Sequence, residues 1–353
     1  MPTKIEWCDE VWNPVTGCTP ISEGCKNCYA ARMAKRLGGR YGYPANDPFR
    51  VTFHPDRLND PLKSKQQRRI FVCSMGDLFH DEVPFNHIAA IFGVMVSASR
   101  HTFMLLTKRP DRAIKFFEWV AKRAEDGRFL FPYDNNEWRI WQMLCVEGRR
   151  FNADIPPHHG GEWPLPNVLI GVTAENQEQA DKRIPVLLHI PAAVRFVSVE
   201  PMLGPVDFQN IHLGQDVFAN VLSGDAWCAG RGPQTNLDAT INWVICGGET
   251  GPGARPMHPD WVRSLRDQCF GDGVPFFFKC WGDWGHGSHF KKTSHVVFQD
   301  GQNTECTRDK LHRIRLIHGD GYVGKGSTMA RVGKKAAGRM LDGQTWDQIP
   351  AGP

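Results

Sequence analysis

Three cysteines stand close together near the start of the chain, with the spacing Cys18-x6-Cys25-x2-Cys28. Three thiolates can bind three irons of a [4Fe–4S] cluster and leave the fourth iron open to a ligand that is not protein. The alternatives are a closed zinc site with Cys8 or a histidine as fourth ligand, and unliganded thiols. Zinc sites commonly use two close pairs of ligands, whereas Cys8 and Cys18 are ten residues apart, so the spacing favours the iron–sulfur cluster.

The composition is that of an ordinary globular protein. The chain has 353 residues, of which 41% are hydrophobic and 23% are charged, enough for one large α/β domain or two average ones. No run of apolar residues approaches the length of a membrane span, and residues 1–8 lack the pattern of a signal peptide. We therefore expect a cytoplasmic protein without membrane association, whose clustered cysteines bind metal or react instead of forming disulfides.

Short apolar runs that end in polar residues recur along the chain and predict buried parallel strands. The clear runs are 70–73, 103–106, 168–172, 195–199, 243–246 and 276–278, and weaker runs at 11–15 and 51–54 would bring the number to eight. Apolar residues at helical spacing predict helices at 84–99 and 258–270. Strands that alternate with helices indicate a barrel or a doubly wound sheet, with the polar residues gathered at the carboxyl ends of the strands.

Three segments depart from this alternation. Residues 122–166 and 207–240 are predicted insertions of the kind that form lids or partner-binding surfaces, and His158 and His159 in the first are expected to face solvent. Residues 286–353 form a C-terminal extension that has 11 Lys and Arg against 6 Asp and Glu. Such a basic extension either contacts phosphate groups or is a solvated surface.

Taken together, the motifs of the chain resemble those of a protein family of unknown function. A cysteine triad in the loop after a first strand, followed by strands with polar ends, resembles the radical S-adenosylmethionine superfamily. More closely, the chain resembles a phage-associated, three-cysteine family of unknown function that is related to that superfamily. The matching segments span nearly the whole chain and are 12–18 (WNPVTGC), 74–80 (SMGDLFH), 106–110 (LTKRP), 171–176 (GVTAEN), 198–201 (SVEP), 247–251 (GGETG) and 333–339 (GKKAAGR).

The resemblance implies a partial or full (βα) barrel of TIM type, formed by residues 1–285, with a [4Fe–4S] cluster on Cys18, Cys25 and Cys28. S-adenosylmethionine would chelate the open iron, and its reductive cleavage would give a 5′-deoxyadenosyl radical that abstracts hydrogen from a substrate. A protein such as flavodoxin or ferredoxin would supply the electron. The chain departs from the commonest pattern in having six residues between its first two cysteines, and in having Asn27 where an aromatic residue is usual, with Tyr29 just after the third cysteine as the candidate to stack on adenine.

Polar residues at the predicted strand ends are candidates for binding the cofactor. Ser74 and Asp77 would receive its amino group, although Asp77 could instead cap the next helix. Thr107, Lys108 and Arg109 could grip a carboxylate or phosphate, or form structural ion pairs. The other candidates lie at the later strand ends, where carboxylates would suit ribose hydroxyls or a cationic group: Thr173, Glu175, Asn176, Glu200 and Glu249.

Three further residues have two interpretations each. Gly247 and Gly248 either let a ligand approach the backbone or only permit a tight turn. Cys280, at the end of the last predicted strand, either has a function, as a donor of a hydrogen atom or a ligand of an auxiliary cluster, or is an inert buried thiol.

Two hypotheses of function follow. The first is a radical S-adenosylmethionine enzyme with an unknown substrate, for which the basic extension and the aromatic residues of the insertions suggest a nucleotide or nucleic acid. The second is a nucleic-acid-binding module with a structural zinc or iron–sulfur site that involves Cys8 and performs no turnover. Acidic strand ends count against the second hypothesis, because they would repel phosphates.

Overall fold

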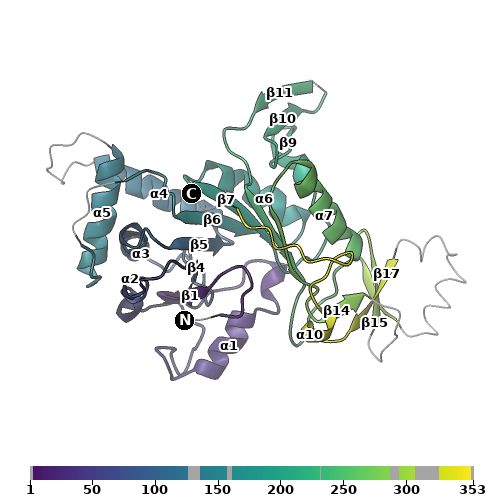
Figure 1. Cartoon of the computed structure of the whole chain (residues 1–353), viewed down its shortest axis with the longest axis horizontal. Helices are drawn as coiled ribbons and strands as arrows, with labels where there is room; N and C mark the ends of the chain where they lie inside the picture. The colour runs from purple at the N-terminus through teal and green to yellow at the C-terminus, as the bar shows by residue number, and fades with distance from the viewer. Residues whose placement is uncertain are drawn as a thin grey trace, which may run out of the picture.

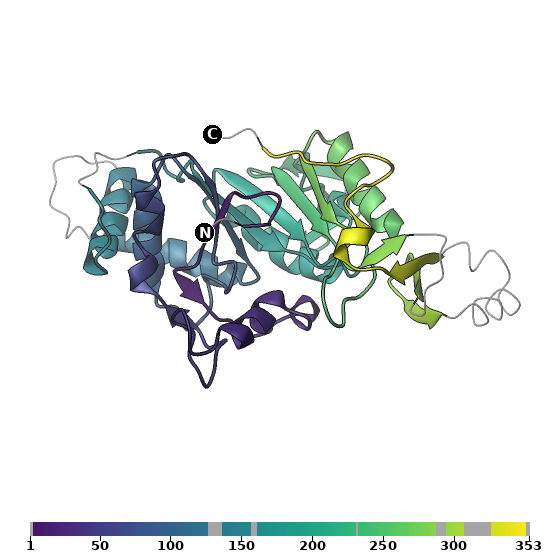
Figure 2. The same ribbon diagram turned by 60° about the horizontal axis from the view of Figure 1, so that its bottom comes forward.

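The computed structural model describes residues 3–125, 136–156, 161–230, 232–286, 294–306 and 326–350. Its central element is a sheet of seven strands in the order β1-β4-β5-β6-β7-β12-β13, in which every neighbouring pair is parallel. The strands curl into a half-barrel (Figures 1 and 2). They are β1 (Glu10–Trp12), β4 (Arg69–Val72), β5 (Thr102–Thr107), β6 (Val168–Thr173), β7 (Val194–Val199), β12 (Trp243–Gly247) and β13 (Phe276–Cys280).

The six clear strand predictions are confirmed. The first weak one, 11–15, is confirmed only in part, because β1 ends at Trp12 and Val15 lies outside the main sheet, and the second weak one is wrong in its position. The run at 51–54 contains β3 (Thr52–Phe53), which pairs antiparallel with β2 (Val15–Thr16) outside the main sheet. A two-residue strand in an antiparallel pair cannot extend the parallel sheet, so the sheet has seven strands and stays a mixed α/β half-barrel with β1 and β13 at its edges.

The chain ends cover the β13 edge and the inside of the half-barrel. The segment near the C-terminus runs beside β13, where Phe278 donates its backbone N–H to Trp346 and Gln348 donates to Phe276. On the concave face, the Trp7 indole contacts the rings of Phe71 and Trp243. These contacts belong to an apolar cluster that fills the half-barrel below the carboxyl ends of the strands.

Helices cover the convex face of the sheet. The predicted helix at 84–99 is α3 (Phe85–Ser97), which is buried along most of its length, and that at 258–270 is α7 (Pro259–Gly271). The other helices are α1 (Tyr29–Leu37), α2 (Asp60–Lys63), α4 (Pro110–Glu125), α5 (Asn136–Arg150), α6 (Gln177–His189) and α10 (Lys334–Ala337). No helix in the described ranges is long and apolar enough to cross a membrane.

The predicted insertions and extension contain regular structure. In residues 122–166, α5 packs side by side with α3 and forms part of the helical layer (Figure 1), while His158 and His159 lie outside the described residues. In 207–240, β8 (Ile211–Gly214), β9 (Val217–Ala219), β10 (Asp225–Cys228) and β11 (Gly232–Asn236) form an antiparallel sheet that projects at the top of Figure 1. A second antiparallel sheet consists of β14 (Trp284–His286), β15 (Ser294–Phe298), β16 (Asn303–Cys306) and β17 (Gly326–Arg331).

Candidate functional site

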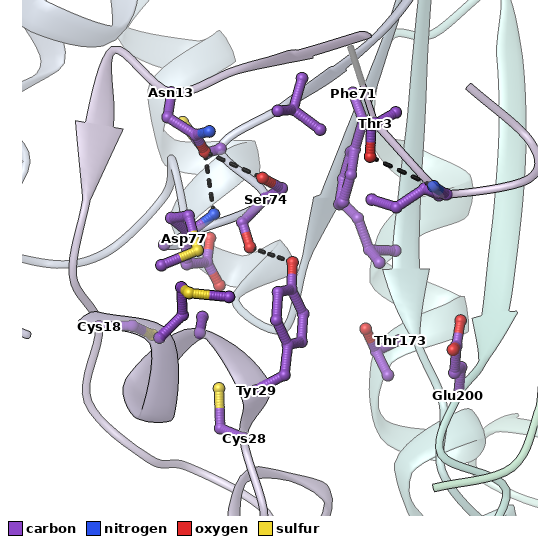
Figure 3. A pocket seen from close by; sticks show the side chains of 18 of the residues that line it. Thr3, Asn13, Cys18, Cys28, Tyr29, Phe71, Ser74, Asp77, Thr173 and Glu200 are labelled. Carbon is purple, nitrogen blue, oxygen red and sulfur yellow. Dashed lines mark hydrogen bonds between the residues drawn. The ribbon is translucent and has the colours of Figure 1, made fainter. Parts of the chain in front are cut away.

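A cavity of about 1180 Å³ lies at the carboxyl ends of the parallel strands, and Cys18, Cys25 and Cys28 all line it. The three cysteines come from the loop between β2 and α1, which crosses the open end of the half-barrel. Figure 3 shows the Cys18 and Cys28 side chains on one wall, next to the Tyr29 ring, with Thr173 and Glu200 on the wall opposite. The sequence-predicted thiols therefore share one cavity with several of the predicted polar residues.

The start of the cysteine loop is held by Arg109, which follows β5. The buried Arg109 guanidinium lies 3.4 Å from the Cys18 sulfur and 3.2 Å from a carboxylate oxygen of Asp77. Its other nitrogen donates to the carbonyl and the hydroxyl of Thr19, at 2.9 and 3.0 Å. One cation thus ties the loop to the ends of β4 and β5.

Asp77 is engaged on both carboxylate oxygens. One accepts hydrogen bonds from the Thr107 hydroxyl at 2.8 Å and from the backbone of Phe79, and the other accepts from the Lys108 backbone and Arg109. The next helix begins only at Phe85, with Pro84 as its N-cap, so Asp77 does not cap it. The buried Asp77 carboxylate positions Arg109 and the end of β5.

The middle of the cysteine loop rests on Glu175, which follows β6. One oxygen of this buried carboxylate bonds both the Ser22 hydroxyl and the Lys108 ammonium, and the other accepts from Arg183 at 2.7 Å. Burial would raise the pKa of Glu175, but the charges of Lys108 and Arg183 outweigh it and hold the pKa below its ordinary value. The contact is so close that a Cβ on Gly24 would come within 2.4 Å of the Glu175 carboxylate.

The end of the loop is held by Glu249, which follows β12. Glu249 accepts from the Asn27 side chain at 3.0 Å and forms a two-point ion pair with Arg255, at 2.9 and 2.8 Å. Arg255 also donates to the carbonyl of Glu23. Burial would raise the pKa of Glu249, but the hydrogen bonds from Arg255 and Asn27 lower it. The carboxylate is therefore ionised and fixes both ends of the segment between Glu23 and Asn27.

The surroundings of the first two cysteines differ. Burial and the Asp77 charge raise the pKa of Cys18 to about 11, against the opposing effect of Arg109. Burial would also raise the pKa of Cys25, but the Lys108 charge and hydrogen bonds from the loop around Ser22 outweigh it and lower the pKa. A cation acts to lower the pKa of each thiol, but it outweighs burial only at Cys25.

The residues that face the open part of the cavity are fewer than the sequence predicts. Tyr29 lies along the cavity with its hydroxyl bonded to the carbonyl of Ser74, whose own hydroxyl donates to Asn13 (Figure 3). Thr173 and Glu200 face them from β6 and the end of β7. Open space lies between Tyr29 and Glu200 in the cavity (Figure 3).

Glu200 is paired with Lys279, a residue of β13. Glu200 accepts from the Lys279 ammonium at 2.6 Å, and both residues line the cavity. Burial would lower the pKa of Lys279, but the Glu200 charge outweighs it and raises the pKa. Lys279 is therefore a fixed cation inside the cavity.

Four predicted site residues have structural roles, and of these only Gly248 is also among the described residues that line the cavity. Asn176 is the N-cap of α6, where its side chain accepts from the backbone of Gln179. Gly248 packs against the Trp281 carbonyl, which a Cβ would approach to 2.2 Å, and Gly247 lies over the Glu200 carboxylate. Cys280 is buried, which raises its pKa. Its neighbour Lys279 is among the described residues that line the cavity, but Cys280 is not.

The described ranges contain no group of three or more His, Cys, Asp or Glu side chains that is arranged to bind a single metal ion. Cys8, the candidate fourth zinc ligand, is buried in the apolar cluster on the concave face and is absent from the described lining of the cavity. The positions of the cysteines therefore do not favour a zinc site closed by Cys8.

Sequence reasoning missed Arg183, Arg255 and Lys279. Arg183 is nearly two helical turns into α6, Arg255 follows a Gly-rich turn, and Lys279 is the only charged residue in its strand. Of the three residues, only Lys279 could have been recognised from the sequence, because a charged residue within an otherwise apolar strand needs a polar environment.

Comparison with known proteins assigns the chain to a family but indicates no activity. No curated protein and no solved structure matches the chain. One family model matches nearly all of it, from residue 2 to residue 350. The chain belongs to the family described as Protein of unknown function (DUF5131).

Proposed function

We propose that the chain is a radical S-adenosylmethionine enzyme that holds a [4Fe–4S] cluster on Cys18, Cys25 and Cys28. The observation that carries the proposal is that all three cysteines line one cavity at the carboxyl ends of parallel strands. In α/β folds this end of the sheet is where ligands bind. The order of motifs along the chain, which resembles that superfamily, supports the same assignment.

The donor set fits a cluster better than a single ion. Three thiols of one loop would each bind a different iron, so their sulfurs can lie farther apart than the ligands of one metal. The absence of a single-ion site in the described residues is compatible with this arrangement. Arg109 beside Cys18 and Lys108 near Cys25 offset part of the negative charge of the thiolates.

The polar strand ends fix the cysteine loop from three directions. Arg109 holds Thr19, Glu175 holds Ser22, and Glu249 holds Asn27. A loop that is held at three points keeps its thiols in place. Less free energy is therefore needed to organise them around the irons. Arg109, Glu175 and Glu249, first considered as residues that bind a ligand, would therefore act as positioning residues for the cysteines.

The open part of the cavity is where S-adenosylmethionine would bind. When bound, the cluster would supply the electron that cleaves the sulfonium C–S bond of the cofactor, in the chemistry typical of the superfamily. Tyr29 presents an aromatic ring beside Cys28, which suits stacking on adenine, and Thr173 and Glu200 offer oxygens to hydroxyl groups. Phe71, Met75 and Leu106 contribute apolar walls to the same cavity.

The experiment combines cluster content with cofactor cleavage. After anaerobic reconstitution with iron and sulfide and reduction by dithionite, the wild type is expected to contain about four irons per chain and to release 5′-deoxyadenosine from S-adenosylmethionine. The triple variant Cys18→Ala, Cys25→Ala, Cys28→Ala is expected to do neither. Cys228→Ala is the matched control, because Cys228 lies in β10, away from the cavity, and should keep both properties. A wild type that binds one zinc and no cluster, and releases no 5′-deoxyadenosine, would refute the proposal.

A further inference from the structure

The cavity has a second wall, rich in lysine, that the proposed cluster does not use. We propose that this wall binds the phosphate group of a nucleotide substrate, and we call it the lysine wall: Lys4, Lys279 and Lys334. The inference rests on the proposed function, since it names the substrate class of the same cavity. It goes beyond that function because none of the three lysines takes part in holding the cysteines.

The three lysines come from separate parts of the chain, and all three line the cavity. Lys279 is in β13, at the edge of the sheet, and Lys334 is the first residue of α10. Backbone hydrogen bonds from Trp281 to Gly338 and from Gly333 to Asp283 attach α10 to the segment directly after β13, which carries Lys279. Lys334 also bonds Glu6 at 3.2 Å, which brings the N-terminal segment that carries Lys4 to the same edge.

Backbone hydrogen bonds hold the GKKAAGR motif (residues 333–339) in place, so that Lys334 lies at the cavity. Gly333 donates its backbone N–H to the carbonyl of Asp283 at 3.0 Å, and the carbonyl of Gly338 accepts from Trp281 at 3.2 Å. These two bonds attach both ends of the short α10 helix to the segment that follows β13. Its first lysine, Lys334, lines the cavity, whereas Lys335 is exposed and is not among the described lining residues.

Exposure decreases along the lysine wall from the solvent to the interior. Lys4 is exposed, the Lys334 side chain is 46% exposed, and the Lys279 side chain is 18% exposed. Lys279 is already paired with Glu200, so an incoming anion would be received mainly by Lys334 and Lys4. The partly exposed pair between Lys334 and Glu6 is weak and can open, because water screens such pairs.

The size of the cavity leaves room for a substrate beside the cofactor. Its volume of about 1180 Å³ is above the range of about 300–1,000 Å³ that is typical of a site for one ligand. The cavity is lined both by cations and by aromatic side chains such as Tyr29 and Phe71, and this combination suits a group that has both a phosphate and a planar base. A nucleoside phosphate combines these features, either free or as part of a nucleic acid.

The test measures binding to the full-length protein without added S-adenosylmethionine, so that it is independent of the cluster. Thymidine monophosphate, thymidine and a single-stranded thymidine oligonucleotide would be titrated by calorimetry into the wild type, Lys334→Ala and the matched control Lys335→Ala. We expect the phosphate-bearing probes to bind more tightly than thymidine, and Lys334→Ala to weaken them about tenfold, while Lys335→Ala keeps the wild-type affinity.

The pattern of binding also identifies the source of the phosphate. Binding of the mononucleotide supports the inference and assigns a free nucleotide, whereas binding of the oligonucleotide alone, with the same loss in Lys334→Ala, supports it and assigns a nucleic acid. The inference is overturned when neither probe binds, when thymidine binds as tightly as its phosphate, or when the two lysine variants behave alike. Because Lys334 does not contact the cysteines, loss of this site would leave cluster formation intact, and a failed cluster would leave phosphate binding measurable.

Discussion

Arg109 donates a hydrogen bond toward the sulfur of Cys18 at 3.4 Å, and the same guanidinium is anchored by the buried Asp77 at 3.2 Å. A positive charge is thereby fixed beside the first thiol of the triad. Because a cluster becomes more negative when it is reduced, a fixed cation at this distance would stabilise the reduced state of the proposed cluster more than its oxidised state.

The first prediction concerns the charge of Arg109. Arg109→Gln is expected to lower the midpoint potential of the reconstituted cluster by about 60 mV, the shift that corresponds to a tenfold change in a one-electron equilibrium. Arg109→Lys should retain most of the wild-type potential because it keeps the charge. Redox titration followed by electron paramagnetic resonance measures the shift, and Arg36→Gln, on the exposed side of α1, is the control. Equal potentials in wild type and Arg109→Gln would show that the charge does not act on the cluster.

The second prediction concerns Glu175 and pH. The folded protein holds the pKa of Glu175 below its ordinary value, so its ion pairs stabilise the fold fully above the unfolded-state pKa of 4.5 and lose this effect as the pH falls through the folded-state value. Glu175→Gln is expected to cost about 3 kcal/mol at neutral pH, because it leaves Arg183 and Lys108 without their carboxylate. Its loss of stability between about pH 6 and about pH 3 should be smaller than that of the wild type.

Urea unfolding at the two pH values measures this effect. The exposed Glu178 on α6 provides the control variant Glu178→Gln, which should follow the wild type. If Glu175→Gln and the wild type lost the same free energy of unfolding on acidification, the ion pairs of Glu175 would not have the role that their geometry assigns them.

The fold follows from the sequence to the extent that strand and helix patterns decide it. Runs such as 168–172 stay buried on both faces of the sheet, and such runs identify strands without knowledge of their neighbours. The pairing of 51–54 with the segment at Val15 could not be predicted, because two residues carry no periodicity and their antiparallel contact is set by the loop between them.

Part of the candidate site can likewise be predicted from the sequence, and part of it cannot. The cysteines and the polar strand ends are visible in the sequence because they are local motifs. That Glu175 and Glu249 hold the loop, instead of facing a ligand, depends on Arg183 and Arg255, which lie 8 and 6 residues further along the chain. Sequence alone does not reveal which of two interactions a carboxylate makes when a cation from a later element is available to pair with it.

The third prediction tests the close contact between the loop and β6. Gly24→Ala would bring a Cβ within 2.4 Å of the Glu175 carboxylate, which must shift or push the loop away. We expect a loss of about 1–3 kcal/mol in stability, typical of overpacking, together with a lower iron content after reconstitution. Gly271→Ala, where a Cβ meets no atom within 4 Å, should leave both unchanged. Normal iron content in Gly24→Ala would mean that the loop does not need this contact.

The fourth prediction concerns the aromatic wall. Tyr29→Ala is expected to weaken the binding of S-adenosylmethionine to the reconstituted protein by about 1–3 kcal/mol, the usual loss when a base no longer stacks on an aromatic ring. Tyr29→Phe keeps the ring and should bind nearly as well as the wild type. Equilibrium dialysis gives the affinities, with Phe270→Ala on the exposed surface of α7 as control. Similar losses in the Phe and Ala variants would assign the effect to the hydroxyl bond with Ser74 instead of the ring.

The central claim is that the three cysteines leave one iron open to S-adenosylmethionine. Low-temperature electron paramagnetic resonance of the dithionite-reduced, reconstituted protein, recorded with and without S-adenosylmethionine, tests it most directly. The account predicts a reduced-cluster signal in the wild type and in Cys228→Ala that changes when the cofactor is added, and no such signal in the triple variant of Cys18, Cys25 and Cys28. A cluster signal that is unchanged by the cofactor, or one that persists in the triple variant, would contradict it.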